Sequence, residues 1–123
     1  MKIDAILFNC LKNLGMPANL SGYTYTKTAV QLVRQNPELI RAITKELYPM
    51  IAETHNTTPT RVERAIRHAV EVTWWQGNID FQKELFGYTI SADKGKPTNS
   101  EFIATIVEYI NLQKDEWGNA KNS

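Results

Sequence analysis

Apolar side chains recur at every third or fourth position along most of this 123-residue chain. That spacing is the period of an α-helix with one buried face. The expected helices cover residues 3–14, 25–33, 37–47, 50–54, 60–76, 80–86 and 98–110. Pro49 either starts the short helix at 50–54 or kinks the helix before it. A run at 88–90 could be extended, but one short strand makes no sheet, so the pattern predicts an all-α fold.

Two of these helices, 50–54 and 60–76, have the spacing of a helix-turn-helix motif. Ala52 is small where this motif needs the second helix to approach closely. Asn56 stands where the turn needs a left-handed backbone, which Asn adopts more readily than any other residue except glycine. Val62 supplies the buried aliphatic side chain that joins the two helices. The motif is therefore predicted from both its helices and its turn.

The second helix of the motif has one apolar side and one polar side. Its start is capped by Thr58, with Pro59 following, or by Thr60, and it is expected to end at Gly77. At about 100° per residue, the apolar side holds Val62, Ala65, Ile66, Ala69, Val70, Val72 and Thr73. The polar arc, of roughly 160°, holds Thr60, Arg61, Glu63, Arg64, Arg67, His68 and Glu71. Such a helix can lie in a DNA major groove while its back seals a core.

Arg64 lies near the centre of the polar arc, and arginine is the side chain that binds guanine O6 and N7 with two hydrogen bonds. Glu63 beside it can accept from the N4 amine of cytosine, so the pair predicts readout of a C·G step. Arg67 suits a phosphate or a further guanine. The other phosphate candidates flank the pair or lie at the helix N-terminus: Arg61, His68, Thr57, Thr58 and Thr60. The alternative is a solvated face in which Glu63 pairs with Arg67 four residues on.

Two further segments have candidate roles. The loop at 94–100 combines Lys94, Lys96 and Ser100 with a helix N-terminus, which suits a phosphate. An ordinary capped connection explains this loop equally well. The segment 77–90 mixes aromatic and acidic residues, and from the residues alone it is interpreted as core, with a docked protein partner as the alternative.

Composition indicates one globular domain, since 42% of the residues are hydrophobic and 10% are aromatic. The net charge of +1 is low for a DNA-binding domain. It predicts modest non-specific affinity and reliance on base contacts or on a second bound copy. No membrane span or signal peptide is visible, and the single Cys10, expected in the core, suits a reducing compartment. We therefore expect a cytoplasmic protein with no membrane partner.

Nothing in the sequence predicts catalysis, a metal site or a cofactor. His55 and His68 are the only histidines, and neither has metal-ligand spacing with acids or with Cys10. No Gly-rich phosphate loop, nucleophile elbow or paired carboxylate site is present. We expect a binding domain and not an enzyme. The rival to DNA binding is a helical protein-interaction module whose arginine face binds an acidic partner.

Several strings of the sequence resemble one known family. They are 57–58, 61–69 (RVERAIRHA), 77–80, 85–89 and 96–104 (KPTNSEFIA), with 14–18, 43–45 and 47–49. They are similar to the C-terminal effector domain of the stage-zero sporulation response regulator (protein A) of endospore-forming Firmicutes. The similarity runs from about residue 11 to residue 112. Residues 81–84 depart from the family's usual pattern, as do Pro59 and Thr60.

The resemblance implies a compact six-helix domain with an embedded helix-turn-helix at 11–114. A linker remnant and the start of the first helix would precede it at 1–10, and a frayed tail would follow at 115–123. The family belongs to two-component systems and activates or represses sporulation genes at boxes with a TGTCGAA-like core. Its phosphorylated receiver domain is not recognisable here. We therefore expect a monomer when free, and a head-to-tail dimer on double-stranded DNA.

The resemblance also implies roles for particular residues. The family's base-reading positions fall on Glu63, Arg64 and Arg67. Its contact with the RNA polymerase sigma factor corresponds to 77–90, where a partner now becomes the better interpretation. The candidate sigma-factor contacts there are Asn78, Asp80, Lys83, Glu84 and Tyr88.

Overall fold

The computed structural model describes residues 2–87 and 95–122, with side chains described up to residue 113. Six α-helices make up most of these residues, and no strand occurs among them, which confirms the all-α prediction. The helices are α1 (Lys2–Leu14), α2 (Ser21–Gln35), α3 (Tyr48–Thr54), α4 (Pro59–Gln76), α5 (Ile79–Phe86) and α6 (Asn99–Asn122). No helix in the described part of the chain is long and apolar enough to cross a membrane.

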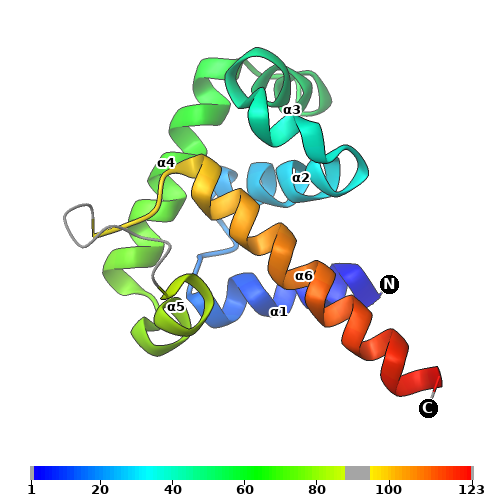
Figure 1. The fold of residues 1–123 in the computed structure, drawn as a ribbon. Helices are drawn as coiled ribbons and strands as arrows, with labels where there is room; N and C mark the ends of the chain where they lie inside the picture. The colour runs from blue at the N-terminus through cyan, green and yellow to red at the C-terminus, as the bar shows by residue number, and fades with distance from the viewer. Residues whose placement is uncertain (1, 88–94, 123) are drawn as a thin grey trace.

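Helix α6 crosses the middle of the molecule, with α2 and α3 above it and α1 and α5 below it in Figure 1. Its inner face is fully buried and consists of Phe102, Ile103, Ile106 and Ile110. Helix α4 packs mainly against α2 and α3 and contributes Val62, Ile66, Ala69 and Val70 to the same core. Helix α1 adds Leu7, Cys10, Leu11 and Leu14. Burial raises the pKa of the Cys10 thiol to about 12, so this group stays protonated and packs as an apolar side chain.

The prediction of one α-helix at 37–47 is wrong. The structure has a 3₁₀ helix at Pro37–Arg41 and a π-helix at Ile43–Leu47 instead. The Asn36 side chain accepts a hydrogen bond from the Glu38 amide at 3.3 Å, which starts the tighter turn. Pro49 lies in the first turn of α3, where a proline ring fits. The π-helix runs into α3 without a break, because Leu47 and Tyr48 both have helical backbone angles.

The helices at the two ends of the chain are α1 and α6, and α6 is longer than the helix expected at 98–110. Helix α6 continues to Asn122, so residues 115–122 are helical where the sequence predicted a frayed tail. Helix α1 (Lys2–Leu14) confirms the helix expected at 3–14, and residues 2–10 form its first turns. The possible extended run at 88–90 lies outside the described residues.

The helix-turn-helix has the expected turn. Asn56 has a φ of 53°, the left-handed conformation that the motif requires. Ala52 is buried beneath the turn, and its carbonyl accepts from the Thr57 amide at 2.9 Å. The Thr58 hydroxyl caps α4 by accepting from the Arg61 amide at 3.2 Å. With Val62 fully buried, the small residue, the turn residue and the aliphatic lock are confirmed, and Thr58 is the cap.

Helix α4 is held against its neighbours by close main-chain contacts at two glycines. A Cβ atom on Gly22 of α2 would overlap the Ala65 carbonyl oxygen of α4. A Cβ atom on Gly77, where α4 ends, would overlap the Leu14 carbonyl oxygen of α1. That same Leu14 oxygen accepts from the Asn78 amide at 3.2 Å. Only glycine permits both approaches, and they fix the start of α2 and the end of α1 on α4.

Candidate nucleic-acid interface

The polar arc of α4 faces solvent along its whole length. Thr58, Thr60, Arg61, Arg64 and His68 are exposed, and Thr57 is half-buried at the start of the helix. The opposite side is buried, as predicted, except that Ala65 and Val72 are only half-buried. No ion pair holds Arg61 or Arg64 among the described residues. The two guanidinium groups therefore stand ready for an external acceptor.

Glu63 and Arg67, both predicted base-reading residues, form an ion pair in the free domain. Arg67 Nη1 lies 3.3 Å from Glu63 Oε1, and the two side chains are 55% and 34% exposed. This is the pairing that the solvated-face alternative expected. An exposed pair four residues apart on a helix contributes only about 0.3–0.5 kcal/mol. The pair is therefore compatible with a switch to external partners, at small cost.

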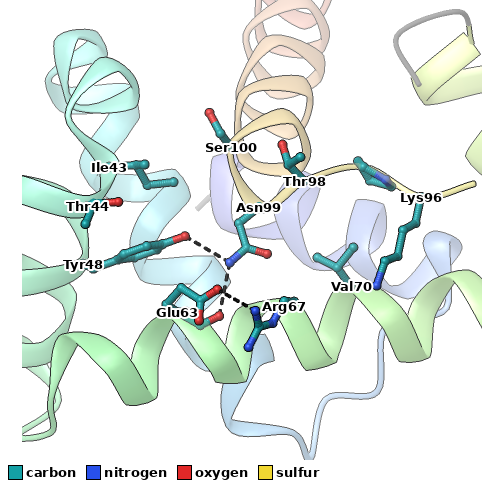
Figure 2. Close-up of a pocket in the computed structure, with 11 residues that line it drawn as sticks. Ile43, Thr44, Tyr48, Glu63, Arg67, Val70, Lys96, Thr98, Asn99 and Ser100 are labelled. Carbon is teal, nitrogen blue, oxygen red and sulfur yellow. Dashed lines mark hydrogen bonds and ion pairs between the residues drawn. The ribbon is translucent and has the colours of Figure 1, made fainter. Parts of the chain in front are cut away.

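Asn99 joins three helices beside this pair. Its Nδ2 donates to the Tyr48 hydroxyl of α3 at 3.0 Å and to the Glu63 main-chain oxygen of α4 at 3.2 Å, as Figure 2 shows. Tyr48 is buried, and burial raises the pKa of its hydroxyl. Neither Asn99 nor Tyr48 was a candidate from the sequence. Their contact holds the first turns of α4 at a fixed distance from α3 and α6.

The connection into α6 is a reciprocal cap. The Thr98 hydroxyl accepts from the Glu101 amide at 3.1 Å, and Glu101 Oε1 accepts from the Thr98 amide at 2.8 Å. The capped-connection interpretation of this loop is therefore correct, while its phosphate role stays a prediction. Of the predicted phosphate contacts here, Ser100 is half-buried and Lys94 lies outside the described residues.

Lys96 reaches back from this loop to α4. Its Nζ donates to Glu71 Oε1 at 2.8 Å, and this pairing lowers the pKa of the Glu71 carboxyl. Helical spacing placed Glu71 on the polar arc, but no role was predicted for it. The contact with Lys96, 25 residues away in the chain, was not predicted either.

An open groove of about 530 Å³ lies between α4 and the start of α6 (Figure 2). Tyr48 and Val70 form part of its apolar wall, and Arg67 and Lys96 approach its edge. The complete lining is Ile43, Thr44, Tyr48, Glu63, Arg67, Val70, Lys96, Pro97, Thr98, Asn99 and Ser100. The groove therefore connects the polar arc of α4 with the capped start of α6.

The predicted partner surface on α5 is exposed. Asn78 caps the helix by accepting from the Phe81 amide at 3.1 Å, and Asp80, Lys83 and Glu84 face solvent. Phe86, on the other side, is buried, so the segment serves the core and a surface at once. Tyr88, the fifth candidate contact, lies outside the described residues.

The described residues contain no group of three or more His, Cys, Asp and Glu residues that could hold a metal ion. The Thr28 hydroxyl lies 2.7 Å from His55 Nε2, within hydrogen-bond distance, and the His55 ring packs against Tyr25. His68 is exposed on α4.

A helix-turn-helix whose second helix exposes an arginine-rich arc defines a DNA-binding domain. Comparison with protein families supports this class and narrows it. Residues 7–110 match the family described as the C terminal of the sporulation initiation factor Spo0A. The match covers most of the chain, so the chain belongs to this family, and it is a sporulation DNA-binding domain of the response-regulator type. Domains of this family regulate transcription and are not a family of enzymes.

Proposed function

We propose that this domain controls sporulation initiation genes by reading a TGTCGAA-like box in the DNA major groove. The observation that carries this proposal is the exposed Arg64, near the centre of the polar arc of α4 and without an ion pair among the described residues. An arginine in that position can bind guanine O6 and N7 with two parallel hydrogen bonds. Because such a domain works on chromosomal DNA, we infer that it acts in the cytoplasm.

Glu63 and Arg67 complete the proposed readout. Glu63 accepts from the N4 amine of the cytosine beside the guanine, and Arg67 turns to a base or a phosphate once their ion pair opens. The DNA backbone is bound by residues at the N-terminus and edges of α4 and by the loop before α6. This set is Thr57, Thr58, Thr60, Arg61, His68, Lys94, Lys96 and Ser100. These contacts orient the helix, and the base contacts supply the preference for one sequence.

The Arg64→Ala variant tests this proposal. We expect it to lose about 1–3 kcal/mol of discrimination between a duplex with the TGTCGAA core and one scrambled at CG. Fluorescence anisotropy over a salt series measures both affinities. Arg41→Ala is the matched control, because it removes the same charge from an exposed position on the 3₁₀ helix.

Equal, steeply salt-dependent binding of the unmodified domain to both duplexes would mean phosphate attraction only. The rival function, a helical module that binds an acidic protein, would then be the better explanation. The same conclusion follows if Arg41→Ala and Arg64→Ala change the preference equally.

The proposal includes the assembly on DNA. We expect the free domain to sediment as a monomer and to form a head-to-tail pair on a duplex with two tandem boxes. Sedimentation velocity with no DNA, one box and two boxes measures this directly. A stable dimer without DNA, or no second copy on the double box, would contradict it.

The exposed side of α5 supports a second contact, with the RNA polymerase sigma factor. Asn78, Asp80, Lys83 and Glu84 are exposed there, and Tyr88 belongs to the same proposed surface. Phe86 of the same helix is buried in the core. A partner on this surface would leave the polar arc of α4 free for DNA.

A further inference from the structure

The contact between Lys96 and Glu71 brings a loop cation onto the DNA-reading side of α4. Glu71 lies on the polar arc, two helical turns beyond Arg64. Lys96 Nζ lies 2.8 Å from Glu71 Oε1, and each side chain is 39% exposed. Figure 2 shows the Lys96 chain extending from the loop down to α4. The Lys96 ammonium group is therefore held beside the polar arc of α4, and the Glu71 carboxylate neutralises its charge.

Glu71 is the second carboxylate on this side that pairs with a cation. Glu63, about two turns earlier on α4, holds Arg67, so Arg67 and Lys96 are both paired with acids of this helix. Lys96, with smaller effects from Arg67 and His68, holds the pKa of the Glu71 carboxyl below its usual range. The Glu71 carboxylate therefore remains charged, and its ion pair with Lys96 stays intact, at neutral and mildly acidic pH.

A paired cation contributes little to binding DNA of arbitrary sequence. Non-specific affinity comes from cations that neutralise phosphates and release the counterions condensed on them. A phosphate that approaches Lys96 must first displace the Glu71 carboxylate, and it also meets the negative charge of that carboxylate. The low net charge of the chain, +1, fits a domain that limits this attraction.

We propose that Glu71 masks Lys96 by pairing with it, and so weakens binding to DNA of unrelated sequence. The inference rests on the proposed function only in that α4 faces DNA. It gives Lys96 a different role from that of a standing phosphate contact, because the lysine is latent until Glu71 releases it. Glu71 acts through Lys96 and is not itself a base-reading residue.

A double-mutant cycle on the scrambled duplex tests the mask. The proteins are the unmodified chain, Glu71→Gln, Lys96→Gln and the double variant, each measured by anisotropy over a salt series. We expect Glu71→Gln to tighten binding roughly threefold to eightfold near 0.1 M salt and to steepen the slope of log K against log salt by about 0.9. In the Lys96→Gln background the same substitution should change affinity less than about twofold, because no masked cation remains.

Lys96→Gln alone should weaken binding only slightly when Glu71 is present. Glu108→Gln is the matched control, since it removes one exposed acid from α6, in a pocket that α6 forms with α5. It should leave the salt slope unchanged. Glutamine is close to glutamate in size, and far-ultraviolet circular dichroism checks that each variant is folded.

Equal tightening by Glu71→Gln in both backgrounds would overturn the mask, because it would reflect the loss of one negative charge and nothing more. Weaker binding of Glu71→Gln would also overturn it, since Glu71 would then be aiming Lys96 at a phosphate. Neither result depends on the box. If the box preference fails but the cycle shows coupling, the proposed function is wrong and the mask stands; the reverse pattern leaves the box readout in place.

Discussion

Gly22→Ala is expected to lower the free energy of unfolding by about 3 kcal/mol, the upper end for overpacking. The added Cβ would overlap the Ala65 carbonyl oxygen and would lie 2.7 Å from the Ala69 Cβ. Ala65 O belongs to the main chain of α4, so it cannot rotate away as a side chain can. Alanine favours a helix interior over glycine by only about 1 kcal/mol. The clash is larger, so destabilisation wins.

Urea denaturation followed by circular dichroism measures this effect. Thr24→Ala is the matched control, because Thr24 is exposed on the same helix and should change stability by no more than about 0.5 kcal/mol. If Gly22→Ala changes the free energy of unfolding by no more than Thr24→Ala does, α2 does not lie against the main chain of α4. A variant that stays folded should also bind the box more weakly, since α2 would have pushed α4 outward.

Phe102→Ala is expected to cost about 3–5 kcal/mol of stability. Phe102 is fully buried, and its ring stacks on Phe86 with centroids 5.6 Å apart and planes 18° apart. Trp74 meets the Phe102 ring edge-on at 6.1 Å. Three helices, α4, α5 and α6, thus meet at one aromatic cluster. Removing the ring leaves a cavity that none of the three can fill without moving.

Phe8→Ala is the control for this variant. Phe8 is 48% exposed on α1, so the same substitution there removes surface contacts and leaves no closed cavity. Thermal and urea unfolding of both variants should differ by at least about 2 kcal/mol in favour of Phe8→Ala. Similar losses at the two positions would mean that the cluster around Phe102 is loosely packed.

The reading helix and its turn could be predicted from the sequence because their signals are local. Thr58 and Pro59 set the start of α4, Gly77 its end, and Asn56 the turn before it. Each works through bonds or torsions within a few residues, which a sequence pattern records directly. The solvent exposure of Arg61 and Arg64 follows in turn from helical period alone.

The parts of the site that could not be predicted are contacts between segments far apart in the chain. The Tyr48–Asn99 bond joins residues 51 apart, and the Lys96–Glu71 pair joins residues 25 apart. The division of the 37–47 segment into two short helices also escaped the periodicity, because its apolar positions fit a continuous helix. Distance in the chain is what separates the predicted from the unpredicted parts of the site.

Besides its buried side chains, helix α4 contacts its neighbours at three main-chain carbonyl positions. Gly22 rests on the Ala65 carbonyl, Asn99 bonds the Glu63 carbonyl, and Gly77 lies against the Leu14 carbonyl. Main-chain oxygens survive any substitution of the side chains beside them. The exposed side chains of α4 can therefore change in evolution while these main-chain contacts keep the position of the helix. Relatives with this scaffold can then acquire new DNA preferences by few mutations.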